Sequence, residues 1–399
     1  MPPPAKDAVC PEKRLLVCSA RTKISPAIAE HIRELVAHSL DWSYLLSEAA
    51  ENSITPLFER ALRAAAPSAI PPEYSTQLKA ALRGNTVRCL FLTAELNGIL
   101  ALFQAADIHA IPYKGPVAAA QAYGDITLRE FEDLDIILRQ RDLPKAHEII
   151  VSLGYQPKFP WILSPGAAAA LVPGEYNYRD DARRAMVELH TEITLRHFPV
   201  VPDLDDFLHR LVPVDLSGHA IQTFRVEDAL PILCIHGSKD FWERISWIAD
   251  ISELVQSHPA LDWDQAERRT ESLKAQRMLH LGLTLAADLL DAPLPPDVLS
   301  HIRADAAAAT IAKEVQHRLL SRELPALDAK GRLNFRRRMV PGVMAGWRYA
   351  ARLAVVPAEE DWQMMRLPAP LAPLYIALRP LRLLRKYGWA GRRSPRLSS

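Results

Sequence analysis

The sequence predicts an α+β protein in which a small mixed sheet lies between two helical regions. Two observations support this prediction. Apolar residues recur at three- and four-residue steps over residues 25–107 and again over residues 227–329, which is the pattern of amphipathic helices. Between these regions, residues 108–226 contain short apolar runs of strand type separated by single short helical segments, an order typical of a compact α/β or α+β domain.

Composition excludes several classes of protein. The chain has 399 residues, of which 49% are hydrophobic and 24% charged, so it is neither wholly disordered, nor collagen-like, nor a coiled-coil rod. The four cysteines are scattered without C-x-x-C spacing, and we interpret them as reduced thiols. No apolar run reaches the roughly 18 residues of a membrane-spanning helix, and no signal-peptide pattern opens the chain. The sequence therefore predicts a cytoplasmic protein of two or three domains with no transmembrane segment.

The two ends of the chain differ from the middle. Residues 1–24 begin with three prolines and lack clean periodicity, so we expect a poorly ordered N-terminus. Residues 330–399 form a basic, proline-rich tail with 15 Lys and Arg against three Asp and Glu, a net charge of +12, while the rest of the chain carries −11. Such a tail can contact phosphates, the anionic lipids of the inner face of a membrane, or the acidic surface of the protein itself.

Within the first helical region, one helix is expected over Thr55–Ala65, because threonine followed by proline is typical of a helix start. A longer helix follows over residues 72–106. Beyond residue 226, the periodicity predicts helices that start near Glu227 and near Ser257 and continue to about Leu320.

The central region predicts three strands and two helices. Strands are expected over residues 108–113, 134–138 and 186–190, and the first of them turns into a helix over residues 117–123. A second helix begins near Asp142 and closes at Gly154.

The carboxylates of this region are its most informative feature. Asp133 and Asp135 are two residues apart at the start of a buried strand, so they point to the same face. Two carboxylates that close need a cation or a proton, and hard oxygen ligands suit Mg²⁺. Glu188 offers a third carboxylate on a later strand, which a two-metal site requires, and shares its face with His190. The alternatives are a solvated acidic turn for the aspartates and an exposed edge strand for Glu188.

Basic residues near these carboxylates suggest phosphate binding. Lys114 and Gly115 lie at a strand-to-helix junction, where a helix N-terminus and a glycine allow a phosphate to approach closely. His236 and Lys239 are one helical turn apart and could line the same cleft and reach a nucleotide. A plain turn and a histidine packed between helices are the corresponding structural alternatives.

The order of these motifs resembles the uncharacterised bacterial nucleotidyltransferase family, which is grouped with the DNA polymerase beta-like nucleotidyltransferases. The resemblance covers roughly residues 30–390, and it extends to a tail similar to members associated with exopolysaccharide gene clusters. It rests on Lys114-Gly115, Arg129, Asp133-Leu134-Asp135, Leu153-Gly154-Tyr155, Glu188-Leu189-His190 and the segment 235–250.

The resemblance implies a nucleotidyltransferase-like fold for residues 108–226 and a role for each motif. Asp133 and Asp135 would hold Mg²⁺ with Glu188 as the third carboxylate, and Lys114 and Arg129 would contact phosphates. Lys114 and Gly115 would replace the glycine-serine turn of the wider superfamily. The chain departs from that pattern, because Gly115 is followed by proline and no serine hydroxyl is present.

The implied function is transfer of a nucleotidyl group from an NTP to an acceptor hydroxyl, with release of pyrophosphate. The acceptor could be a small molecule, a glycan or a protein. The alternative is a non-catalytic nucleotide-binding or scaffold protein in a surface-polysaccharide or peptide-modification assembly. The absent serine favours that alternative, and the three carboxylates oppose it.

Overall fold

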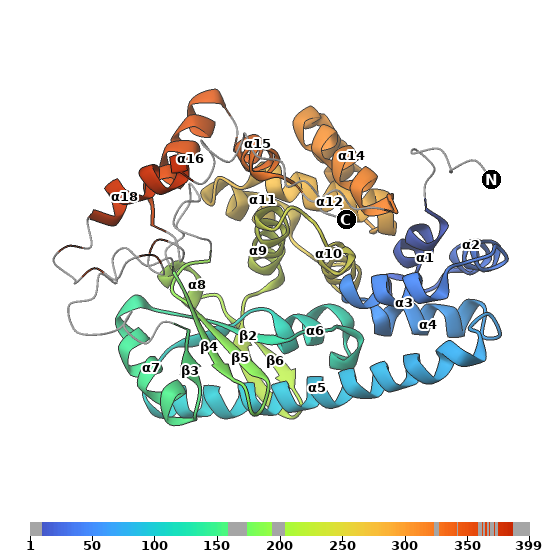
Figure 1. Cartoon of the computed structure of the whole chain (residues 1–399), viewed down its shortest axis with the longest axis horizontal. Helices are drawn as coiled ribbons and strands as arrows, with labels where there is room; N and C mark the ends of the chain where they lie inside the picture. The colour runs from blue at the N-terminus through green and yellow to red at the C-terminus, as the bar shows by residue number, and fades with distance from the viewer. Residues whose placement is uncertain are drawn as a thin grey trace, which may run out of the picture.

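A computed structural model describes residues 10–158, 174–193, 204–322, 327–340, 342–357 and 374–385, together with Asp361, Met364, Leu367 and Leu371. Within these residues the protein has two layers (Figure 1). The lower layer contains the sheet and one long helix, and the upper layer consists of helices from both ends of the chain.

The sheet has five strands in the order β1-β2-β5-β4-β3. Strands β2 and β5 are parallel, and the other neighbouring pairs are antiparallel, so the predicted small mixed sheet is confirmed. The strands are β1 (Ala110–Pro112), β2 (Asp133–Leu138), β3 (Gln156–Pro157), β4 (Glu175–Asp180) and β5 (Ala185–His190). Two further strands, β6 (Val212–Leu216) and β7 (His219–Thr223), pair in a separate hairpin.

Apolar and acidic side chains alternate along the first half of β2, so the sheet has an apolar face and a polar face. Leu134, Ile136 and Leu138 are buried in a core that they share with α5 (Pro72–Ala105) and α7 (Leu143–Ser152). Helix α5 runs along the lower edge of the molecule in Figure 1. The aspartates of β2 therefore face the opposite way, toward the upper layer.

Helix α5 is the one described helix whose length and apolar composition would allow it to cross a membrane. A third of its most apolar part is buried. One such helix is weak evidence, because a core helix of a soluble protein passes the same test. Here Leu92, Leu96 and Phe103 of α5 pack into the core beneath the sheet.

The N-terminal helices follow one another closely. They are α1 (Pro11–Ser19), α2 (Pro26–Val36), α3 (Trp42–Glu51) and α4 (Thr55–Ala65), and α4 has the predicted bounds. The expectation of poor order over residues 1–24 is wrong for the described part. Leu15 and Leu16 of α1 are fully buried, and the N–H of Cys10 donates to the carbonyl of Leu320 at 3.2 Å. This order comes from packing against α2–α4 and against helices within residues 276–320, which the periodicity of the segment itself does not reveal.

The C-terminal helices complete the upper layer. They are α9 (Val226–Lys239), α10 (Ile245–Ser257), α11 (Trp263–Ser272), α12 (Gln276–Leu290), α13 (Pro296–Ala304) and α14 (Ala306–Leu320). The start near Glu227 and the end at Leu320 are confirmed, but the start near Ser257 is wrong. Helix α10 ends there, and α11 begins after Asp262, whose carboxylate accepts the N–H of Gln265 at 2.9 Å. A single core joins these helices to α1–α4.

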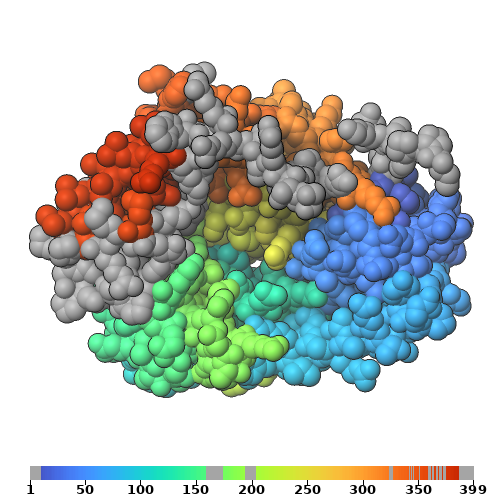
Figure 2. Space-filling model, in the orientation of Figure 1, coloured from blue at the N-terminus to red at the C-terminus, as the bar shows by residue number. Residues whose placement is uncertain are grey.

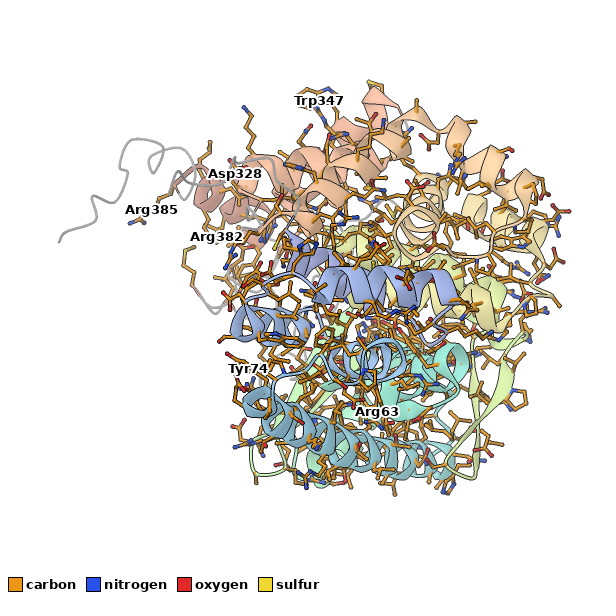
Figure 3. The ribbon with its side chains drawn as sticks, turned by 90° about the vertical axis from the view of Figure 1, so that its right-hand side faces the viewer. Arg63, Tyr74, Asp328, Trp347, Arg382 and Arg385 are labelled. Atoms are coloured by element: carbon orange, nitrogen blue, oxygen red, sulfur yellow. The ribbon has the colours of Figure 1, made fainter. Side chains whose placement is uncertain are left out.

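Part of the basic tail packs on the body of the protein. Helix α15 (Ala329–Met339) places Arg338 2.8 Å from Glu314, so some tail charge pairs with the acidic body. Beyond it, α16 (Val343–Val355) and α18 (Leu374–Leu383) lie at one corner of the molecule (Figure 1). Figure 3 shows Trp347 at the upper edge of the molecule and Arg385 clear of the helices, and both are exposed.

Candidate active site

The parallel pairing of β2 with β5 brings two carboxylates together. Asp135 is the register partner of Glu188, so both side chains project from the polar face of the sheet. They line a cleft of about 900 Å³ together with Asp133, Lys114 and Gly115. Figure 2 shows the molecule hollowed between its two layers, where cyan, green and yellow segments meet.

Asp135 is the buried centre of this cleft. Its Oδ1 lies 2.9 Å from Lys114 Nζ and 3.1 Å from His190 Nε2. Burial by itself would raise the pKa of Asp135, but the charge of Lys114 and the hydrogen bond of His190 hold that pKa well below its usual range. Asp135 is therefore ionised, and its negative charge is balanced by Lys114 and His190.

His190 is held between two carboxylates. Its Nε2 is 3.5 Å from Glu188 Oε2 as well as 3.1 Å from Asp135 Oδ1. Burial disfavours the imidazolium, yet the two carboxylates together raise the pKa of His190 to about 9. His190 is consequently a cation at neutral pH in this state of the cleft.

Asp133 lies at the mouth of the strand. Burial raises the pKa of Asp133 to about 7, and the negative charges of Asp135 and Glu188 contribute to that rise. A carboxylate in this position gains most from an added positive charge, because a cation would relieve both the burial cost and the repulsion.

The turn that precedes α6 (Gly115–Tyr123) brings its backbone close to β2. Gly115 has φ +52°, and a Cβ at this position would lie 3.1 Å from the carbonyl oxygen of Asp133. Glycine is therefore needed both for the left-handed conformation and for the close approach. Pro116, in the first turn of α6, removes one of the N–H groups with which a helix N-terminus binds phosphate.

Arg129 lines the cleft, but it is bound to a carboxylate of α10. Its Nε and Nη2 each donate to Asp250 at 2.9 Å, and the hydroxyl of Tyr123 donates to the same carboxylate at 2.8 Å. This bidentate pair connects the loop before β2 to the upper layer. Arg129 thus orients the cleft walls, and its Nη1 is the nitrogen that could reach a phosphate.

The opposite wall of the cleft comes from α9 and α10. Lys239 Nζ is 3.5 Å from Glu175 Oε2 of β4. The ring of His236 packs edge-on against Trp247, with centroids 5.3 Å apart. Burial lowers the pKa of His236 well below its usual value, and the nearby charges of Lys114 and Lys239 lower it further. Both residues proposed from the helical spacing therefore line the cleft.

Several cleft residues were not identified from the sequence. Glu175 was missed because β4 was not predicted, although its alternating Tyr176 and Tyr178 are a strand signal. His190 was placed on the face of Glu188, but it was not expected to bind Asp135. Four arginines of the cleft wall had no local signal, namely Arg88, Arg179, Arg184 and Arg244.

The donor set of the cleft fits a divalent cation. Asp135, Glu188 and His190 each present one nitrogen or oxygen atom, and these atoms lie within 4.8 Å of one another, so a cation bound by all three would displace the proton of His190. Two carboxylates on adjacent strands supply the hard oxygens that Mg²⁺ prefers. From the sequence we expect Asp133 in this group, whereas in the structure His190 lies with the other two and Asp133 lines the same cleft.

Comparison with known proteins identifies a family. A family model described as "uncharacterised nucleotidyltransferase" matches residues 38–291, which include every cleft residue named above. No curated protein matches the chain.

Two solved structures are similar in fold. The antibiotic-resistance factor ANT(2'')-Ia is 11% identical and has a TM-score of 0.32, over 46% of this chain and 91% of that one. An antigenic nucleotidyltransferase-like protein from Paracoccidioides brasiliensis is 16% identical and has a TM-score of 0.30, over 55% of this chain and 92% of that one.

Proposed function

Because this chain belongs to the uncharacterised nucleotidyltransferase family, we propose that its cleft transfers a nucleotidyl group from an NTP to an acceptor hydroxyl. The observation that supports this proposal best is the pairing of Asp135 with Glu188 across β2 and β5, with Asp133 at the cleft mouth. Three carboxylates on two neighbouring strands can hold metal ions, and the cleft of about 900 Å³ that they line is large enough for a metal–triphosphate complex.

At the α-phosphorus, the reaction forms one bond and breaks one bond. The acceptor oxygen bonds to the α-phosphorus, the bond from that phosphorus to its bridging oxygen breaks, and pyrophosphate leaves with the electron pair. Glu188 is the group we assign to receive the proton of the acceptor hydroxyl. Bound Mg²⁺, held by Asp133 and Asp135, would neutralise charge on the triphosphate.

Lys114 has two roles in this proposal. In the structure its ammonium neutralises Asp135 at 2.9 Å. Once that carboxylate is compensated by a metal, the ammonium is free to bind a phosphate at the N-terminus of α6. Gly115, Arg129, His236 and Lys239 line the same space and would contact the nucleotide, Arg129 through Nη1.

The test uses Asp135→Asn, which keeps the size of the side chain and removes one metal-binding charge. Wild type should gain thermal stability from an NTP only when Mg²⁺ is present, by about 2.7 kcal/mol at 100 times the dissociation constant. The variant should lose most of this gain. Metal-independent melting that is equal for both proteins, with every NTP, would refute the nucleotide site.

One observation favours a second candidate, a nucleotide-binding scaffold without turnover. Lys114 and His190 already compensate Asp135, and Pro116 weakens the phosphate site at α6. A scaffold of this kind would bind Mg²⁺ and NTP but release no pyrophosphate with any acceptor from a broad set of sugars, lipid-linked glycans and peptides. Pyrophosphate release that Asp135→Asn abolishes would establish the enzyme.

The location of the protein belongs to the proposal as well. We assign it to the cytoplasm, where NTPs are available, with the basic tail as a contact to anionic lipid at the inner face of the membrane. The exposed Trp347 and Arg385 are among the described residues that support such a contact.

A further inference from the structure

A second cluster of metal-ligating side chains lies where α11, α12 and α13 meet. Glu267, His280 and His301 come one from each helix, and their ligand atoms lie within 4.8 Å of one another. His301 Nε2 is 3.9 Å from Glu267 Oε1, and the two imidazole rings have centroids 5.3 Å apart. None of the three residues lines the nucleotidyltransferase cleft.

Asp305 supports the buried histidine of this cluster. Its Oδ2 lies 3.3 Å from His280 Nδ1. Its Oδ1 accepts the N–H groups of Ala307 and Ala308 at the start of α14, so the carboxylate is fixed by the backbone. When Nδ1 donates to Asp305, Nε2 of His280 keeps its lone pair. In metalloproteins, a metal-bound histidine usually donates its other ring N–H to a group such as this carboxylate, which fixes the orientation of the ring.

Burial and charge differ across the cluster. The His280 side chain is only 11% exposed, whereas those of His301 and Glu267 are 57% and 35% exposed. Arg277 approaches Asp305 at 3.4 Å, and its Nη1 donates to the carbonyl of Arg338 at 2.8 Å. The cluster thus has one buried ligand and two outer ligands that are exposed to solvent.

We propose that Glu267, His280 and His301 bind a divalent transition metal of the zinc class, at a site separate from the nucleotidyltransferase cleft. Two imidazole nitrogens and one carboxylate match the donors of Zn²⁺ in proteins, whereas Mg²⁺ prefers oxygen alone. Zn–N distances of about 2.1 Å require the ligand atoms to approach to roughly 3.5 Å. The exposed His301 and Glu267 side chains can close that gap by rotamer changes.

The bound ion would link three consecutive helices more firmly than their packing, the hydrogen bond from Gln276 to Glu271 and the exposed His301–Glu267 pair do. It would leave a fourth coordination position for water, because the structure supplies three ligands. The expected consequence is a C-terminal helical region that is more stable in zinc than in chelator.

Zinc binding by EDTA-treated full-length protein tests the site. Wild type should bind Zn²⁺ in calorimetry and melt about 3 °C higher in excess Zn²⁺. His301→Ala should lose one bound ion and this stabilisation, and Glu267→Gln should bind at least tenfold more weakly. His317→Ala, an exposed histidine of α14, is the matched control and should behave as wild type.

Two further measurements separate this site from the cleft. The Asp135→Asn variant should keep the ion that His301→Ala loses, since Asp135 is not part of the cluster. Co²⁺ in place of Zn²⁺ should give the visible absorption of a four-coordinate N/O site in wild type and in Asp135→Asn, but not in His301→Ala. Equal stoichiometry and equal Co²⁺ spectra in wild type and His301→Ala, or no zinc binding by wild type, would overturn the proposal.

Discussion

The ammonium of Lys114 lies 2.9 Å from Asp135 Oδ1, and both side chains are largely buried, with exposed fractions of 11% and 3%. An ion pair of this kind depends on both partners, because a buried carboxylate without its cation is costly. The pair also connects the turn before α6 to the centre of β2. The same contact therefore supports the fold and controls the charge of the candidate metal site.

Lys114→Met should test both effects at once. It removes the ammonium but keeps the apolar stem, and we expect the free energy of unfolding to fall by about 3 kcal/mol. If the cleft binds a metal, millimolar Mg²⁺ should restore more stability to this variant than it adds to wild type. Urea unfolding with and without Mg²⁺ measures both quantities.

Lys239→Met is the matched control for that experiment. Lys239 faces Glu175 at 3.5 Å, and both side chains are 22% exposed. This contact is longer and its side chains are less buried than those of the Lys114–Asp135 pair, so we expect a smaller loss of about 1 kcal/mol. Similar losses for the two lysine variants would contradict the special role of the Lys114–Asp135 pair.

Gly115→Ala should cost more than an ordinary left-handed glycine replacement. Gly124, at the other end of α6, has φ +68° and nothing within 4 Å of an added Cβ, so Gly124→Ala carries the conformational cost of about 1 kcal/mol alone. At Gly115 the new methyl group also meets the Asp133 carbonyl at 3.1 Å. We expect thermal melting to show a larger loss for Gly115→Ala, and nucleotide-dependent stabilisation to disappear only in this variant.

Glu130 should make the stability of the protein depend on pH. Its Oε2 accepts the N–H of Thr55 at 3.0 Å, and burial raises the pKa of Glu130 to about 7, above its ordinary value of 4.5. The folded state therefore favours the protonated form. This contribution to stability is complete below about pH 4.5 and is lost as the pH rises through 7.

Glu130→Gln isolates that effect, because the amide oxygen can still accept from Thr55 but does not ionise. Between pH 5 and pH 8 the unfolding free energy of wild type should fall by about 2 kcal/mol more than that of the variant. Urea titrations at the two pH values provide the measurement. Parallel pH profiles for the two proteins would show that Glu130 is ionised without cost in the fold.

The basic tail should contribute to the binding of anionic surfaces. Removal of the residues after Glu360 deletes α18 and the residues that follow it, including the exposed Leu381, Leu384 and Arg385. The truncated protein should bind phosphatidylglycerol vesicles more weakly, with the largest difference at low salt. Vesicle sedimentation measures this binding. Absence of binding by the full-length protein at low ionic strength would mean that the tail charges pair within the protein, as Arg338 does with Glu314.

Local patterns predicted much of the fold. Thr55-Pro56 starts α4 where expected, and the aspartate spacing placed Asp133 and Asp135 on one face of β2. Strand β4 and the order of α1 were missed. Strand β4 gains its stability from pairing with β5, and α1 is ordered by burial against α2–α4 and against α12 and α14. Contacts between separate strands and helices leave no periodic pattern in the sequence of the segment itself.

By itself, the sequence determined which residue types are available and which face of its own element each of them occupies. It therefore indicated the carboxylates of β2 and β5, the Lys114–Gly115 turn, and the spacing of His236 and Lys239. Only the tertiary structure decided their partners. It placed Asp135 between Lys114 and His190, committed Arg129 to Asp250, and brought Glu267, His280 and His301 together from three helices. The physical reason is that alternation and helical period fix directions within one element, while distances between charges on different elements depend on strand register and helix packing.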